Sequence, residues 1–347
     1  MIWNRLWYEG HPLALALTPL ALLYCAAVWL RRQVYRLGLR RVHRMGVPVI
    51  VVGNITAGGT GKTPLIAWLA ARLREQGYRP GIIARGYGGR ARHWPQQVRP
   101  DSDPRTVGDE PVLLARRTGC PMAVGPDRVA AARALLQHSD CDILISDDGL
   151  QHYALARDIE IAVVDGDRRY GNGLCLPAGP LREPRSRLQE VDLIVCHGTP
   201  GRGEFGMHYV AGQLINVHDH EQRLDPDQLR GRQVDAVAGI GHPERFYRLL
   251  ERQGLNCRKQ RSFRDHHAYS ETDFDFADAH TPVVMTEKDA VKCERLARDN
   301  LWYLPIQAEL DPRMESRLQR LLPQSRHPRE GGDPVTTAVS GSRPTPG

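Results

Sequence analysis

A glycine-rich loop directly after an apolar segment constrains the fold of this chain more than any other feature. The apolar residues 47–52 lead into Gly58-Gly59-Thr60-Gly61-Lys62-Thr63, and an amphipathic segment follows. A loop of this kind, between a strand and a helix, can curl its backbone N–H groups around a polyphosphate. The lysine can then reach the outer phosphates, and the threonine hydroxyl can ligate Mg²⁺. The sequence therefore predicts a P-loop and a protein that uses a nucleoside triphosphate.

The loop departs from the usual P-loop pattern at one position. Thr56 stands where the pattern has its first glycine, so the match depends on residues 58–63. A glycine-rich turn formed only for packing is the alternative, but the strand before the loop and the helical pattern after it argue against that interpretation. We expect the nucleotide to contact the whole loop, namely Thr56, Ala57, Gly58, Gly59, Thr60, Gly61, Lys62 and Thr63.

Short apolar runs alternate with helical stretches along the chain, which is typical of a parallel sheet covered by helices on both faces. The predicted strands of a P-loop domain over residues 46–200 are 47–52, 81–84, 122–124, 143–145, 159–164 and 193–196. The predicted helices are 64–76, 110–117 and 127–138. The fold class is therefore α/β, with a doubly wound parallel sheet.

A second cycle of strands and helices predicts a smaller α/β domain over residues 201–322. Its expected strands are 209–217, 234–239, 257–263 and 282–286, and its expected helices are 243–253 and 288–298. Residues 302–306 are predicted to return and pair with 209–217 as a two-stranded link between the domains. Residues 323–347 contain few apolar side chains and are predicted to be a disordered, dispensable tail.

The N-terminal residues 1–45 form a hydrophobic and then basic segment. No charge occurs from Pro12 to Leu30, and a helix of this length is about 28 Å long, close to the hydrocarbon thickness of a bilayer. Six arginines follow between Arg31 and Arg44, which predicts that the rest of the chain lies on the cytoplasmic side. A long buried core helix is the alternative, and Pro19 leaves open whether the segment spans the membrane or lies in one leaflet.

Composition narrows the class of protein further. The net charge of +7 indicates a polyanionic partner without requiring nucleic acid. Seven cysteines are scattered along the sequence without C-x-x-C spacing, which is typical of reduced cytosolic thiols and predicts no zinc site.

Acidic side chains follow one of the predicted strands and precede one of the predicted helices. Asp147 and Asp148 come directly after an apolar strand, where carboxylates can hold a metal ion beside the P-loop. Asp109 and Glu110 lie at the start of the helix predicted at 110–117. Local pattern favours Asp109 as a helix N-cap, although a carboxylate at this place can also face phosphates.

Three further groups of polar residues are candidates for the site. Arg85 and Tyr87 follow a predicted strand at the sheet edge where ligands gather, although solvated loop residues are the alternative. Arg182 and Glu183 form either a surface ion pair or part of a metal site. His266 follows Asp265, and a histidine beside a carboxylate can be tuned as a proton acceptor.

Together these motifs closely resemble those of the tetraacyldisaccharide 4′-kinases, the lipid A kinases of Gram-negative bacteria. The resemblance covers residues 1–322. It is carried, in chain order, by Gly53-Asn54, the loop at 58–64, Arg85-Gly86-Tyr87-Gly88, Gly108-Asp109-Glu110-Pro111, residues 147–152, Leu181-Arg182-Glu183-Pro184, Phe263-x-Asp265-His266-His267 and residues 286–290.

The resemblance implies a kinase that uses ATP and Mg²⁺ to phosphorylate the 4′-hydroxyl of a tetraacylated glucosamine disaccharide 1-phosphate. The partners it implies are this glycolipid and the cytoplasmic face of the inner membrane. It further implies that Asp109 receives the hydroxyl proton with His266 as its tuning partner, and that Lys62 grips phosphate. The other implied roles are metal ligation by Thr63, Asp147, Asp148 and Glu183, and substrate binding by Arg85, Tyr87, Glu110 and Arg182.

Two other functions remain open from the sequence. An ATPase switch of the partitioning or metal-delivery class has a related loop, but here Ala57 occupies the place of the first lysine of that loop. A membrane-tethered scaffold that binds ATP without turnover would leave Asp109 and His266 without a role.

Overall fold

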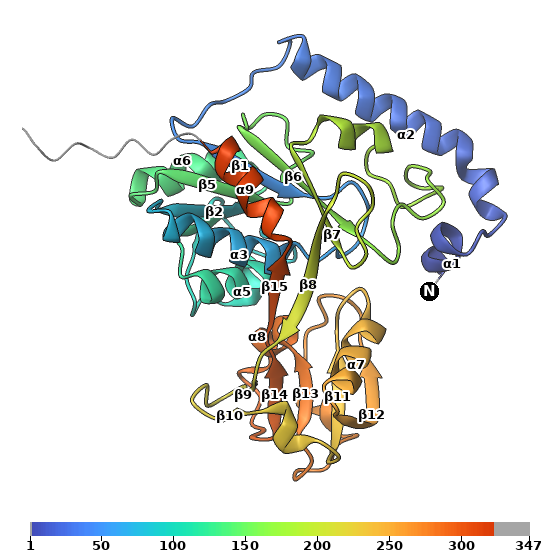
Figure 1. The fold of residues 1–347 in the computed structure, drawn as a ribbon, viewed down its shortest axis with the longest axis vertical. Helices are drawn as coiled ribbons and strands as arrows, with labels where there is room; N and C mark the ends of the chain where they lie inside the picture. Colours follow the sequence, from blue (N-terminus) through green and yellow to red (C-terminus); the bar gives the residue numbers. More distant parts are fainter. Residues whose placement is uncertain (1, 323–347) are drawn as a thin grey trace, which may run out of the picture.

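The computed structural model describes residues 2–322, which form two α/β lobes joined by a pair of strands (Figure 1). The upper lobe carries the P-loop, and the smaller lobe lies below it in this view. The predicted disorder of residues 323–347 concerns a part of the chain outside the described residues.

The sheet of the upper lobe has nine strands within the described residues, in the order β15-β8-β7-β6-β1-β5-β2-β4-β3. The strands from β8 to β4 run parallel, whereas β15 and β3 are antiparallel edges. β1, β2, β5 and β6 are buried along their whole length, as expected for strands covered on both faces. The bounds are β1 (Val49–Gly53), β2 (Pro80–Ala84), β3 (Gln96–Val98), β4 (Met122–Val124), β5 (Ile143–Asp147), β6 (Ile159–Asp165), β7 (Leu193–His197), β8 (Phe205–Ala211) and β15 (Ile306–Leu310).

Helices cover both faces of this sheet, so the predicted doubly wound α/β fold is confirmed. One face packs under α3 (Lys62–Glu75), α5 (Asp109–Thr118) and α9 (Pro312–Leu321), whose apolar side chains share one core. The other face packs under α6 (Arg128–His138) and the 3₁₀ helix η1 (Arg185–Glu190). The short helix α4 (Pro104–Val107) precedes α5.

The smaller lobe has a six-stranded sheet within the described residues, in the order β10-β9-β14-β13-β11-β12. β11, β12, β13 and β14 run parallel to one another, whereas β9 is antiparallel to both β14 and β10. The bounds are β9 (Leu214–Asn216), β10 (Arg223–Leu224), β11 (Gln233–Ala238), β12 (Asn256–Ser262), β13 (Val283–Thr286), β14 (Leu301–Leu304), α7 (Pro243–Arg252), α8 (Glu287–Cys293), η2 (Pro226–Leu229) and η3 (Glu271–Phe274).

The predicted two-stranded link between the lobes is confirmed, with a break that the sequence analysis missed. The single strand expected at 209–217 is divided into β8 and β9, and its partner is divided at Pro305 into β14 and β15. β8 pairs with β15 in the upper sheet, and β9 pairs with β14 in the lower sheet. At the crossing between the lobes, Gly212 N donates to Pro305 O at 2.9 Å. Residues 201–322 therefore contribute strands to both sheets.

The helix expected at 288–298 is shorter than predicted. α8 ends at Cys293, and Arg298 lies outside it with its guanidinium donating to the Phe274 carbonyl at 3.1 Å. α8 packs against α5 of the upper lobe, so it lies at the contact between the two lobes.

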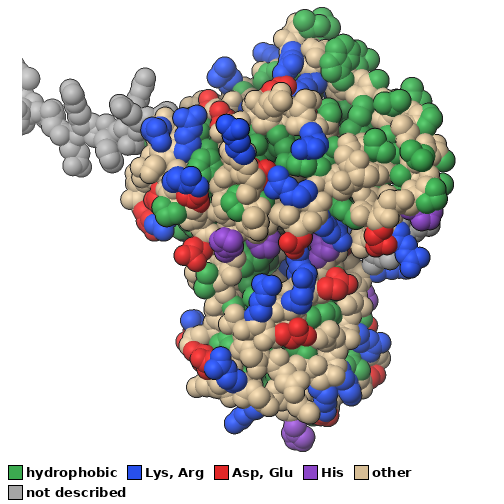
Figure 2. Space-filling view, turned by 45° about the vertical axis from the view of Figure 1, so that its right-hand side comes forward, with side chains coloured by type: hydrophobic (Ala, Val, Ile, Leu, Met, Phe, Trp, Pro, Cys, Tyr) green, Lys and Arg blue, Asp and Glu red, His purple; other side chains and the backbone are tan. Residues whose placement is uncertain are grey.

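Two N-terminal helices, α1 (Ile2–Tyr8) and α2 (Leu13–Arg36), lie over the upper lobe (Figure 1). α2 is long and apolar enough to cross a membrane, and only 11% of its most apolar stretch is buried. The alternative of a buried core helix is therefore wrong. Figure 2 shows apolar side chains gathered along the upper rim of the molecule. The large exposed apolar side chains of α2 are Leu13, Leu15, Leu20, Leu22, Leu23, Trp29 and Leu30.

Polar contacts hold the N-terminal helices on the upper lobe. Trp7 Nε1 donates to the carbonyl of Pro177 at 3.0 Å, and the Tyr24 hydroxyl donates to the carbonyl of Arg182 at 3.2 Å. At the end of α2, Arg36 pairs with Glu190 of η1 at 2.5 Å. The apolar face of α2 is thus held in a fixed orientation relative to the P-loop lobe.

Candidate active site

The P-loop connects β1 to α3 at the edge of the sheet where the parallel strands end. Gly61 precedes α3 with a φ of +89°, a left-handed conformation that favours glycine. A Cβ at this position would overlap the Tyr209 hydroxyl, so any side chain here would have to displace Tyr209. The helix begins at Lys62, two residues earlier than predicted, which places the lysine and Thr63 in its first turn.

Asn54 holds the P-loop in its conformation through hydrogen bonds, a role that was not predicted from the sequence. Its side chain is fully buried, and its Nδ2 donates to the carbonyls of Thr56 at 2.9 Å and Gly58 at 3.2 Å. Its Oδ1 accepts a bond from Lys62 Nζ at 3.4 Å. On the outer side, Ala57 N donates to the carbonyl of Pro180 at 2.7 Å. The conformation of the loop is therefore defined by protein contacts on two sides.

The strand-end carboxylates lie beside the P-loop. β5 is parallel to β1, with Asp147 opposite Val52, so Asp147 and Asp148 reach the sheet edge from which the loop starts. Asp148 pairs with Lys62 Nζ at 3.3 Å and with Arg182 Nη1 at 2.9 Å. Burial raises the pKa of Asp148, but the charges and hydrogen bonds of these two cations outweigh it and lower the pKa to about 2.

Asp147 has a different environment from its neighbour. Its side chain is buried, and its Oδ1 has no hydrogen-bond partner among the described residues. Burial raises its pKa to about 7, since the nearby Lys62 only partly offsets the cost of a buried charge. Within residues 2–322, no group of three or more His, Cys, Asp or Glu side chains is arranged to hold a metal ion.

Arg182 and Glu183 do not form the surface pair considered from the sequence. Arg182 contacts Asp148, and Glu183 is buried with 1% exposure. Glu183 Oε2 accepts a bond from Gln151 at 2.9 Å, and its Oε1 accepts one from the Tyr153 hydroxyl. Both oxygens of Glu183 therefore have protein partners.

Arg85 and Tyr87 follow β2 at the same sheet edge, and both side chains are exposed. The Tyr87 ring lies 5.1 Å from the His266 ring. Tyr87 is therefore accessible to a ligand beside the Asp109–His266 pair.

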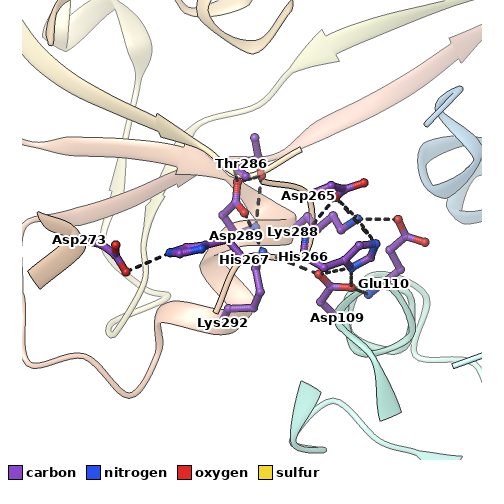
Figure 3. A network of polar contacts seen from close by, with 11 residues as sticks. Asp109, Glu110, Asp265, His266, His267, Asp273, Thr286, Lys288, Asp289 and Lys292 are labelled. Carbon is purple, nitrogen blue, oxygen red and sulfur yellow. Dashed lines mark hydrogen bonds and ion pairs between the residues drawn. The ribbon is translucent and has the colours of Figure 1, made fainter. Parts of the chain in front are cut away.

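Asp109 lies at the first position of α5 and faces the smaller lobe. Its side chain is 5% exposed, and His266 Nδ1 lies 2.9 Å from Oδ1 and 3.0 Å from Oδ2 (Figure 3). The N-cap position is Gly108, so the expectation that Asp109 caps the helix is wrong. Its carboxylate does accept the N–H of Glu110 at 2.9 Å, which favours negative charge at the start of the helix.

The surroundings of Asp109 favour its ionised form. Burial raises its pKa, but the hydrogen bond from His266 and the charges of Lys288, His266 and Lys292 lower the pKa to about 2. The same hydrogen bond raises the pKa of His266, against burial and the charge of Lys288. Glu110 pairs with Lys288 Nζ at 2.8 Å, which adds a second contact between α5 and α8.

A P-loop beside strand-end carboxylates, in a doubly wound parallel sheet, defines a P-loop nucleotide-binding protein. Comparisons with known proteins define the family. A family model described as "Tetraacyldisaccharide-1-P 4'-kinase" matches residues 13–323. The chain therefore belongs to the tetraacyldisaccharide-1-P 4′-kinase family.

Individual relatives agree with this assignment. A tetraacyldisaccharide 4′-kinase of Nitrosococcus oceani is 55% identical over 323 residues, which cover 92% of this chain and 94% of the relative. A tetraacyldisaccharide 4′-kinase of Aeromonas hydrophila is 51% identical over 308 residues, which cover 88% of this chain and 92% of the relative. The crystal structure of LpxK from Aquifex aeolicus in complex with ATP has a TM-score of 0.75 and 27% identity, and the match covers 89% of this chain and 99% of that chain.

These findings confirm the predicted family, the α/β P-loop fold and a kinase that uses ATP. They favour the kinase over the alternative of an ATPase switch. The predicted roles of individual residues remain predictions.

Proposed function

We propose that this protein transfers the terminal phosphoryl group of ATP to the 4′-hydroxyl of a tetraacylated glucosamine disaccharide 1-phosphate, at the cytoplasmic face of the bacterial inner membrane. The observation that carries the proposal is the contact between Asp109 and His266 across the lobes, on the sheet edge that also carries the P-loop. This arrangement supplies a phosphate cradle and, beside it, an ionised carboxylate for an acceptor hydroxyl.

In this proposal Asp109 accepts the proton of the sugar hydroxyl, and His266 orients the carboxylate. A general base has a limited effect in phosphoryl transfer, where positioning and charge neutralisation provide most of the rate enhancement. Lys62 neutralises charge on the phosphates that residues 56–63 hold. Arg85 and Tyr87, which are exposed, and Glu110 and Arg182 are proposed to contact the substrate.

The residues around Asp147 fit a magnesium ion. Asp147, at the end of β5, has an unpartnered Oδ1, and Thr60 of the P-loop has a buried, unpartnered hydroxyl, so both offer an oxygen to a cation. Mg²⁺ is commonly bound by one or two carboxylates together with substrate phosphates, so it does not require a cluster of protein ligands. We propose that Thr63, Asp147 and Asp148 hold the ion, with Glu183 nearby. When bound, Mg²⁺ neutralises charge on the transferring phosphoryl group.

The N-terminal helices fit a glycolipid substrate. The exposed apolar side chains of α2 are suited to the acyl region of a membrane, and the arginines that follow are suited to anionic headgroups. Because α2 is fixed on the P-loop lobe, binding at the membrane surface would bring the sugar of the glycolipid near the site.

The test is phosphoryl transfer from labelled ATP to the tetraacyl disaccharide 1-phosphate, with full-length protein in mixed micelles and Mg²⁺ present. We expect labelled glycolipid from the wild type and a loss of at least about a hundredfold from Asp109→Asn, with ATP binding retained. Release of inorganic phosphate without labelled glycolipid would contradict the proposal.

A further inference from the structure

Lysine is rare in this chain, which contains four lysines and 43 arginines. Three of the four, Lys62, Lys288 and Lys292, lie in the site described above. The fourth, Lys259, lies on β12, where its Nζ donates to the Phe276 carbonyl at 2.6 Å. An ammonium is a compact charge, whereas a guanidinium is a wide planar fork, so the two side chains are not interchangeable where space is limited.

Lys292 lies on α8 between two carboxylates. Its Nζ is 2.9 Å from Asp289 Oδ1 and 3.7 Å from Asp109 Oδ2 (Figure 3). It also lies 5.1 Å from the centre of the Tyr269 ring. The side chain is 10% exposed. A cation buried at this place stabilises negative charge on Asp109 more than an exposed one would.

Asp289 holds this cation in place. Its carboxylate is fully buried, and its Oδ2 accepts bonds from Gly239 N at 2.9 Å and from the Thr286 hydroxyl at 2.6 Å. These bonds leave Oδ1 facing Lys292. Because one carboxylate is anchored by donors of its own lobe, the lysine is positioned with its charge available to Asp109.

Lys288 lies one turn earlier on α8 and contacts His266, the partner of Asp109. Its Nζ is 3.4 Å from His266 Nε2, 2.8 Å from Glu110 and 3.0 Å from Asp265. An ammonium can only donate hydrogen bonds, so the contact with Nε2 is favourable when that nitrogen carries a lone pair. The remaining proton of a neutral imidazole is then on Nδ1, which donates to Asp109.

We propose that Lys288 and Lys292 are positioning residues that favour the form in which Asp109 is ionised and His266 is neutral, with its proton on Nδ1. This inference rests on the proposed function of Asp109. As the sugar oxygen bonds to the terminal phosphorus of ATP, the bond from that phosphorus to the bridging oxygen breaks and releases ADP. The hydroxyl proton passes to Asp109 and then to solvent, so His266 need not take it up.

The charged groups around Asp109 and His266 determine in which direction a lysine substitution shifts the protonation of this pair. The cations that face it are the two α8 lysines, and the other charged or titratable neighbours are Glu110, Asp265, Asp289, Tyr87 and Tyr269. The neighbouring acids favour protonation, and the two lysines oppose it. Removing either lysine should therefore make the pair easier to protonate, whichever member takes the proton.

The test is the pH dependence of kcat and kcat/KM for full-length Lys292→Met, Lys292→Arg and Lys259→Met. We expect Lys292→Met to lower kcat roughly tenfold with little change in the KM for ATP, and to move the acid limb to higher pH by about one unit. Lys292→Arg keeps the charge, so its acid limb should stay near that of the wild type while the wider guanidinium lowers kcat. Lys259→Met, the matched control, should behave as the wild type.

An acid limb that does not move in Lys292→Met, at whatever rate, would overturn the inference, because it would limit Lys292 to a structural contact between the lobes. If that variant fails to fold, Lys288→Met provides the same measurement, with the same expected direction. Asp109→Asn separates the two proposals. Full turnover in Asp109→Asn would reject the proposed function. A loss of turnover in Asp109→Asn together with a fixed limb in Lys292→Met, or in Lys288→Met where Lys292→Met fails to fold, would reject only this inference.

Discussion

His266 Nδ1 lies 2.9 Å from Asp109 Oδ1, although the two residues are 157 positions apart in the chain. Asp109 belongs to the P-loop lobe, and His266 follows β12 of the smaller lobe. The contact therefore requires both lobes, since His266 and Lys292 of the smaller lobe approach a carboxylate that the P-loop lobe carries.

If the two residues act as a unit, their substitutions will not be additive. We expect Asp109→Asn to lower kcat by at least about a hundredfold and His266→Asn by a smaller factor, with the double variant no slower than Asp109→Asn alone. Steady-state kinetics on the wild type and the three variants completes a double-mutant cycle. Effects that multiply would show that His266 acts independently of Asp109.

The lysine of the P-loop should affect turnover more than folding. Lys62 Nζ lies 3.3 Å from Asp148 and 3.4 Å from Asn54 Oδ1, so it is held at the edge of the loop. We expect Lys62→Ala to lower turnover by at least about a hundredfold, with an unchanged circular dichroism spectrum. Lys259→Ala is the control, and equal losses in both variants would contradict a specific role for Lys62.

The pH dependence of folding stability should also reflect the contact between Asp109 and His266. The pKa of Asp109 is lowered to about 2 from 3.8, so its contribution is present above pH 3.8 and is lost as the pH falls through about 2. The pKa of His266 is raised above 6.5, so its contribution is fully present below 6.5 and is lost as the pH rises through the raised value. Melting temperatures of wild type and Asp109→Asn should therefore differ most in the window between these limits. A difference that does not depend on pH would contradict this assignment.

The sequence predicted those parts of the fold that depend on local pattern. Apolar runs and a glycine-rich turn are sufficient to define the strands around the P-loop, because buried parallel strands are apolar throughout. The break of the linking strands at Gly212 and Pro305 was missed, because both halves read as one apolar run and the break is set by which sheet each half joins. The length of α8 was overestimated for a similar reason, since Arg298 is drawn to the Phe274 carbonyl by tertiary contact.

Site residues that belong to a sequence motif could be predicted, whereas a residue whose role depends on a tertiary contact could not. Asp109 and His266 were expected from the family resemblance, whereas Lys292 is an unremarkable residue within a short helix. Its position becomes informative only once α8 is seen to pack on α5. The rarity of lysine in an arginine-rich chain marks Lys292 only together with Lys62, Lys259 and Lys288, so the sequence does not single it out.

A buried ion pair under the N-terminal helices should contribute to stability. Arg187 is 2% exposed, and its Nη2 donates to both oxygens of Glu160 at 2.5 and 2.6 Å. Glu160 Oε1 also accepts a bond from Arg157 Nη1 at 2.9 Å, and without Glu160 the nearest acid to Arg187 is Glu183 at 3.7 Å. Removing Glu160 therefore takes the close partner from two buried guanidiniums, which costs about 3–5 kcal/mol. We expect Glu160→Ala to lower the melting temperature clearly, and Asp140→Ala, which breaks an exposed pair with Arg79, to leave it unchanged. Equal melting temperatures for the two variants would contradict this.

The apolar face of α2 should determine membrane association without supporting the fold. Leu15, Leu22 and Leu23 are 77%, 65% and 68% exposed, so replacing them by glutamine removes no packing from the body of the protein. We expect the triple variant to move from the membrane fraction toward the soluble fraction and to bind vesicles more weakly, with an unchanged melting temperature, because burial of an exposed leucine in lipid is worth about 2 kcal/mol. Val210→Gln is the control, since Val210 is 48% exposed on β8, far from α2 in the chain. If the triple variant partitions as the wild type does, the membrane contact lies outside this face of α2.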